Sequence, residues 1–297
     1  MSSCKQMETL EAFDGIELYC ETFASPQPKG VIIALHDYAE HCGLYDGIFE
    51  RMARESYHVY AMDLRGHGKS PGDRAFIANF DYFLEDLDLF LARVRDREAE
   101  LAAHIFLLGQ GLGATIAARF ALTRKPRVRG LILCSPLLDL PLSRMERTLA
   151  LVPGGLFPHA PVSGQVQTSW LEPKLRGILK DDQLAFRGPL QLNTVREILA
   201  ACHDLRTGEQ HLPFPLLTMV GGEVKGDQTH LTRELQETVL SSDKTLLTYE
   251  DMDDNVLLHR ERDQVVGDII EWCDRVVLEE QSALAVEEDE EDEDDRL

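Results

Sequence analysis

The sequence has no run of the roughly 18 to 20 consecutive apolar residues that a membrane-spanning helix needs. Its first eleven residues contain one lysine, two glutamates and no apolar block, which is not the pattern of a signal peptide. The six cysteines form no CxxC pair and no metal-ligand spacing, which favours a reduced compartment over a disulfide-bonded or zinc-binding protein. We therefore expect a cytoplasmic protein with no transmembrane segment, no metal and no cofactor.

Basic residues are scarce relative to acidic ones. The chain has 30 Lys and Arg against 52 Asp and Glu, a net charge of −22, which repels a nucleic-acid backbone and excludes nucleic acid as a partner. Nine acidic residues form an unbroken run at 287–295. Because such a run repels itself, we predict a disordered acidic tail over 281–297. A solubilising role for it is favoured over docking to a basic partner.

The hydrophobic content of 44% is sufficient for a large core. Short apolar runs alternate with longer amphipathic stretches, which predicts an α/β fold with a mostly parallel central sheet and helices on both faces. The predicted strands are 16–23, 31–35, 59–62, 105–108, 131–134, 216–220 and 245–249. The predicted helices are 81–94, 115–122, 194–205 and 263–278.

The alternation stops between Pro141 and Pro213. A segment of this length between two strands predicts a cap over the carboxyl edge of the sheet. The expected organisation is a first part of the core at 1–140, a cap or lid at 141–212 and a second part of the core at 213–280. The apolar stretch 149–157 suits ordinary cap packing, an acyl pocket or contact with a membrane surface.

A glycine-rich turn follows the predicted strand 105–108. The segment from Gly109 to Ala114 precedes a helical run, which is the layout of the G-x-S-x-G nucleophile elbow, but the middle residue is Gly111. The turn lacks the Gly-Lys-Ser/Thr ending of a P-loop, and its spacing does not give G-x-G-x-x-G. An elbow without a nucleophile is the better interpretation.

Two further segments carry a family resemblance. His36 to Tyr45 (HDYAEHCGLY) resembles the H-G-x-x-E-H-x-G-x-Y segment of the monoacylglycerol lipase and lysophospholipase group of α/β-hydrolases, which is serine aminopeptidase-like. Asp63 to Ser70 (DLRGHGKS) resembles the D-x-R-G-H-G-x-S turn of that group. The similarity continues at 80–91, 131–136 and 261–272, and it implies an α/β-hydrolase fold with an inserted cap. It also implies hydrolysis of carboxylic esters by a Ser-His-Asp triad.

All three triad positions differ from that pattern. Gly111 stands where the resemblance implies the serine, Lys225 where it implies the acid, and Asp254 where it implies the histidine. Glycine has no nucleophile, a charged lysine accepts no proton, and an aspartate is a poor base near neutral pH. We predict a catalytically inactive homologue that binds a ligand or a protein. The opposite charges of Lys225 and Asp254 predict an ion pair between the two loops.

An ester hydrolase that uses relocated residues is the alternative. The candidates are His259 as the base, Asp139 and Asp227 as acids, and Cys42, Cys134 and Ser135 as nucleophiles. Structural roles are favoured for all of them: Cys134 and Ser135 end a buried strand, and His259 suits a surface histidine. Structural turns are likewise the favoured setting of His36, His41 and His67.

The resemblance also implies an oxyanion hole made by the backbone N–H groups of Leu112 and Tyr38. Asp37 replaces the family's glycine beside the second donor, so we expect a changed geometry and a changed affinity for anions. The expected ligand is an acyl or other apolar small molecule. A partner protein and peripheral membrane contact through the cap stay open.

Overall fold

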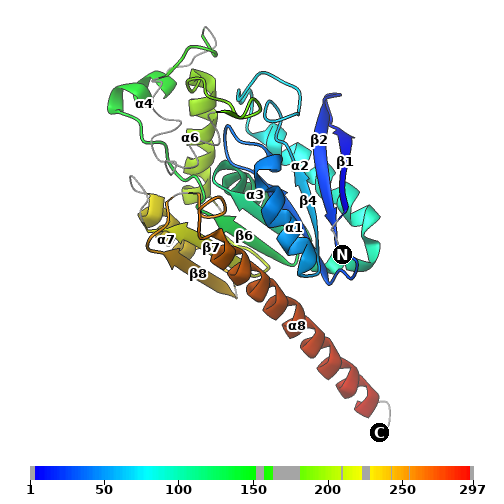
Figure 1. Ribbon diagram of the computed structural model, residues 1–297. Coiled ribbons are helices and arrows are strands. Elements are labelled where there is room, and N and C mark those ends of the chain that lie inside the picture. The colour runs from blue at the N-terminus through cyan, green and yellow to red at the C-terminus, as the bar shows by residue number, and fades with distance from the viewer. Residues whose placement is uncertain are drawn as a thin grey trace.

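The computed structural model describes residues 4–151, 157–162, 181–208, 210–222, 228–241, 243–253 and 255–294 (Figure 1). Its centre is an eight-stranded sheet with the order β1-β2-β4-β3-β5-β6-β7-β8. The strands are β1 (Cys4–Glu11), β2 (Glu17–Ala24), β3 (Gly30–Leu35), β4 (Tyr57–Met62), β5 (Ile105–Gln110), β6 (Gly130–Cys134), β7 (Leu216–Gly221) and β8 (Lys244–Tyr249). All seven predicted strands are present, and the predicted fold class is confirmed.

Strand β1 is an addition to the prediction. It pairs antiparallel with β2, which pairs antiparallel with β4, while the other neighbours in the sheet are parallel. Because β1 lies at the edge, it needs few apolar side chains, and its Met7 is 65% exposed. Its composition therefore gives little strand signal, unlike the strands buried on both faces.

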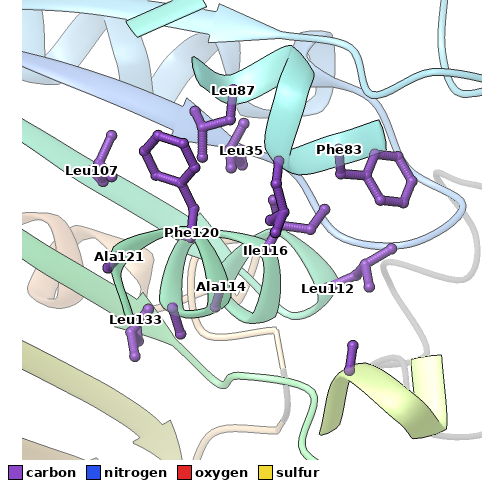
Figure 2. Packing of buried hydrophobic residues seen from close by; sticks show 14 of the residues in the cluster. Leu35, Phe83, Leu87, Leu107, Leu112, Ala114, Ile116, Phe120, Ala121 and Leu133 are labelled. Atoms are coloured by element: carbon purple, nitrogen blue, oxygen red, sulfur yellow. The ribbon is translucent and has the colours of Figure 1, made fainter. Parts of the chain in front are cut away.

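Helices cover both faces of the sheet. Their bounds are α1 (Asp46–Arg54), α2 (Asp81–Arg97), α3 (Leu112–Arg124), α4 (Arg144–Leu151), α6 (Leu192–Thr207), α7 (Gln228–Thr238) and α8 (Arg262–Asp294), with short 3-10 helices η1 (Cys42–Tyr45) and η2 (Ala99–His104). Side chains of α2 and α3 pack on one face of the strands, as Figure 2 shows for Phe83, Ile116 and Phe120. Those of α1 and α8 pack on the opposite face.

The region predicted as a cap contains α4 and α6, which lie together at one end of the body in Figure 1. Helix α6 is tied to the loop before α2, because Thr194 Oγ1 accepts a hydrogen bond from the N–H of Ile77 at 3.0 Å and the Asn193 amide donates to the Ile77 carbonyl at 2.7 Å. Residues 152–156 and 163–180 lie outside the described residues, so the bounds 141–212 remain a prediction.

Helix α8 continues to Asp294 and extends away from the body (Figure 1), whereas the sequence predicts a disordered tail from residue 281. Alanine, leucine and glutamate favour a helix locally, while acidic charge at the last turn opposes the helix dipole. These two influences act in opposite directions on the same segment. Disorder of 281–297 in solution stays a prediction, and residues 295–297 lie outside the described residues.

Within the residues that the structure describes, no helix is long and apolar enough to cross a membrane. The same residues contain no group of three or more side chains suited to hold a metal ion. Five cysteines are buried with free thiols: Cys20, Cys42, Cys134, Cys202 and Cys273.

Candidate functional site

The turn between β5 and α3 has the backbone of a nucleophile elbow. Gly111 adopts φ 53° and ψ −115°, a conformation that costs a residue with a Cβ atom on the order of 1–3 kcal/mol. Its N–H donates to the Cys134 carbonyl at 2.9 Å, and its carbonyl accepts from the Leu137 N–H at 3.1 Å. These bonds fix the turn against the end of β6. The strand, tight turn and helix are as the sequence predicts.

Close packing explains the third glycine of this segment, Gly113. A Cβ atom on Gly113 would lie 2.4 Å from the Leu35 carbonyl oxygen, well inside contact distance. The first turn of α3 therefore approaches the end of β3 directly. Because of this approach, the N-terminus of α3 lies next to the loop after β3.

The two expected oxyanion donors converge on one atom. The N–H groups of Leu112 and Tyr38 each donate to Oδ1 of Asp37 at 2.7 Å. Leu112 begins α3 and Tyr38 follows β3, so the donors come from segments distant in sequence. A carboxylate of the chain itself thus takes the position in which an anion is expected. The sequence marked Asp37 as a departure from the family but did not predict this occupancy.

Asp37 also fills the space above the elbow. A Cβ atom on Gly111 would lie 2.0 Å from Oδ1 of Asp37 and 2.3 Å from Oδ2. The carboxyl group therefore occupies the volume that the side chain of a nucleophile would need. Gly111 and Asp37 fit each other, and a side chain at 111 requires Asp37 to move.

Burial raises the pKa of Asp37 to about 6, although the N–H groups of Leu112 and Tyr38 act to lower it. Glu40 lies three residues further and is buried; it accepts hydrogen bonds from the Tyr45 hydroxyl and, at 2.8 Å, from the Asn255 amide. Burial and the charge of Asp37 raise the pKa of Glu40 to about 8. Both pKa values are therefore above the ordinary range of a carboxyl group, and the N–H groups of Leu112 and Tyr38 favour Asp37 as the charged member of the pair.

The loop after β4 has a supporting role. Asp63 is buried, and its two carboxylate oxygens accept from the N–H groups of Cys42 and Lys69, each at 2.7 Å. The Ser70 hydroxyl donates to the Asp63 carbonyl at 2.6 Å. The buried Arg65 forms two hydrogen bonds with Asp86 at 2.7 and 2.6 Å. The Cys42 contact holds the loops after β3 and β4 together, and the Arg65 pair holds the loop after β4 to α2.

The three histidines of the family pattern occupy structural positions. His36 donates to the Asp37 carbonyl at 2.7 Å and accepts from the Leu64 N–H at 2.9 Å. Burial lowers the pKa of both His36 and His67 to about 3, so both rings are neutral. His41 Nε2 lies 2.8 Å from a carboxylate oxygen of Asp182 in the cap region.

The candidates for relocated chemistry do not form a triad among the described residues. Asp139 is held by Arg147 at 2.8 and 2.7 Å. The hydroxyl of Ser135 is buried and has no hydrogen-bond partner among those residues. Burial raises the pKa of the Cys42 and Cys134 thiols. His259 is only 4% exposed, so the expectation of a surface histidine is wrong; its Nδ1 accepts from the Glu261 N–H.

The other two triad positions, Lys225 and Asp254, lie outside the described residues, as does the alternative acid Asp227. Their proposed ion pair therefore stays a prediction. The described part of the site consists of the elbow and the loop after β3, which includes the buried Glu40.

The chain is similar to a known protein family and to several lipases. The family model for serine aminopeptidase, S33, matches residues 26–261. The monoacylglycerol lipase of Mycolicibacterium smegmatis is 24% identical over 276 residues, covering 92% of this chain and 98% of that protein. The monoglyceride lipase of Rattus norvegicus is 28% identical over 264 residues, covering 86% and 85%. The crystal structure of Paleococcus ferrophilus monoacylglycerol lipase superposes with a TM-score of 0.77 at 24% identity, covering 88% and 99%.

The matched residues include the loop after β3, the elbow and the segment leading into α8. The sheet order, the elbow backbone and the family match agree with the resemblance read from the HDYAEHCGLY and DLRGHGKS segments. This chain belongs to the serine aminopeptidase, S33, family and is an α/β-hydrolase of the monoacylglycerol lipase-like group.

Proposed function

We propose that the protein is a catalytically inactive member of this family that binds an apolar ligand or a partner protein. The observation that carries the proposal is the elbow, in which Gly111 holds the nucleophile's backbone conformation with no side chain to attack an ester. The Asp37 carboxylate, bound by both expected oxyanion donors, adds a second obstacle. A substrate carbonyl oxygen could not accept from those N–H groups while Asp37 holds them.

The remaining nucleophiles support the same proposal. No described base contacts the Ser135 hydroxyl, and raised thiol pKa values keep Cys42 and Cys134 protonated. Retention of the sheet and of the helices α4 and α6 in the cap region preserves the scaffold of a binding site. A cytoplasmic location and contact of the cap with membranes belong to the proposal as well.

The experiment compares the purified protein with the rat monoglyceride lipase on short and long acyl esters. A serine-reactive fluorophosphonate reports any activated serine in either protein. We expect turnover and labelling of the lipase and neither for this chain. Inhibitor-sensitive turnover by this chain would overturn the proposal and would support a hydrolase with relocated residues.

Two variants locate the cause of the inactivity. We expect Gly111→Ser alone to stay inactive, because triad groups act as a unit and removal of the base alone costs roughly a millionfold in subtilisin. Gly111→Ser combined with Asp37→Gly removes the overlap at the elbow and tests whether that overlap alone prevents turnover. Lipase-like rates in either variant would show that a base is present and would contradict the predicted loss of the triad.

A further inference from the structure

We propose that Asp37 inverts the polarity of the binding centre, so that the ligand head it accepts is a protonated amine or a hydroxyl rather than a carbonyl or an anion. This inference rests on the proposed binding function and names the chemical class of its ligand. An oxyanion hole offers hydrogen-bond donors to an acceptor. Here both donors are already used within the chain, and the group next to them is itself an acceptor.

The hydrogen bonds are unevenly distributed over the carboxylate. Oδ1 of Asp37 receives both N–H groups, from Leu112 and Tyr38, each at 2.7 Å. Among the described residues no hydrogen bond reaches Oδ2. This oxygen is not among the fully buried side-chain atoms that lack a hydrogen-bond partner, so it is not fully buried. Asp37 as a whole is partly exposed. One oxygen therefore anchors the side chain, and the other has no hydrogen-bond donor among the described residues.

The charge of this group is not neutralised by its described surroundings. The described groups that stabilise the charge of Asp37 are the N–H groups of Leu112 and Tyr38, with no cation among them, and its acidic neighbour Glu40 interacts with Tyr45 and Asn255 rather than with a base. Gly111 adds no side chain beside the carboxylate. A protonated amine would form a charge-assisted hydrogen bond with Oδ2 and would compensate the charge.

The net charge of the whole chain also favours a cationic ligand. Its net charge of −22 attracts cations and repels carboxylates before any specific contact forms. This general attraction is screened by salt, whereas a contact at a partly buried carboxylate is screened less. The salt dependence of ligand affinity therefore distinguishes binding at Asp37 from attraction by the net charge of the chain.

The test uses three probes of equal chain length that contain no ester: octylamine, 1-octanol and octanoate. Binding is measured by calorimetry at about 0.15 M salt and a pH of about 7.5, at which the amine is protonated. We expect the affinity to fall in the order octylamine, 1-octanol, octanoate. Absence of octylamine binding, or tighter binding of octanoate, would overturn the inference.

Asp37→Asn is the sharpest variant, because the amide oxygen can still accept both N–H groups while the amide nitrogen replaces Oδ2 by a donor. We expect octylamine affinity to fall by about tenfold or more and octanoate affinity to rise. The matched control is Asp88→Asn, which removes an exposed carboxylate on α2 and should leave the order of affinities unchanged. Equal effects of the two variants on octylamine affinity would show that the probes respond only to the net charge of the chain.

Asp37→Gly gives an independent readout. It frees the N–H groups of Leu112 and Tyr38, so octanoate should become the preferred probe. Failure of this reversal would contradict the assignment of the two donors to Asp37. None of these measurements depends on ester turnover, so the outcome is distinct from that of the activity assay.

Discussion

Two aspartates follow neighbouring parallel strands and have different tasks. Asp63, after β4, spreads its hydrogen bonds, with one backbone N–H on each oxygen. Asp37, after β3, concentrates both N–H groups on Oδ1. Asp63 is 1% exposed, whereas Asp37 is partly exposed. A carboxylate whose two oxygens both accept hydrogen bonds from the backbone holds loops together. A carboxylate that accepts such bonds on one oxygen can still accept a hydrogen bond from a ligand on the other.

The largest expected effect is that of Asp63→Asn. An amide has one acceptor, so one of the N–H groups of Cys42 and Lys69 would face another donor in a buried site. We expect the free energy of unfolding to fall by about 3 kcal/mol, measured by chemical denaturation. Asp88→Asn is the control and should change it little. A loss below about 1 kcal/mol would show that the bonds of Asp63 do not hold the two loops.

The second prediction tests the fit between Gly111 and Asp37. Gly111→Ser should destabilise the fold by about 2 kcal/mol, because of backbone strain and overlap with the carboxylate. In a double-mutant cycle with Asp37→Gly, part of this loss should be recovered, giving a coupling energy above about 0.5 kcal/mol. Additive effects would contradict the overlap at the elbow.

The third prediction concerns pH. The pKa of Glu40 is about 8 in the folded state, above its ordinary value, so its contribution to stability is present at low pH and is lost as the pH rises through about 8. The stability of the wild type should therefore fall by up to about 1.4 kcal/mol per pH unit between the ordinary pKa and 8. Glu40→Gln should flatten this slope while keeping its partners Tyr45 and Asn255. Parallel pH profiles of melting temperature for the two proteins would contradict the assignment.

The smallest expected effect is that of Asp37→Asn on stability. Since one amide oxygen can accept both N–H groups, the free energy of unfolding at neutral pH should change by no more than about 0.5 kcal/mol. The contrast with Asp63→Asn, made by the same chemical change, is the direct test of the comparison. Equal losses in the two variants would show that Oδ2 of Asp37 is engaged as fully as either oxygen of Asp63.

The sequence predicts features that have a local pattern and does not predict features that depend on tertiary contacts. Strands β3, β5 and β6 were predictable because they are buried on both faces, and the elbow because its small residues have a fixed spacing. Edge strand β1 was not, since exposure removes its apolar signal. The occupancy of Leu112 N–H by Asp37 joins residues 75 positions apart, and it depends on a side-chain rotamer that no local pattern encodes. The burial of His259 likewise results from tertiary packing.

The loop that carries Asp37 is also fastened to the cap region. His41 contacts Asp182, and the Phe186 N–H donates to the Ala39 carbonyl at 2.8 Å. From the loop after β4, Arg74 donates to the Leu184 carbonyl. Any separation of this segment from the sheet must break the bonds to Ala39 and His41 in the loop of Asp37. The amide of Phe186 therefore reports the separation of this segment from the sheet, because its rate of hydrogen exchange measures how often these bonds are broken.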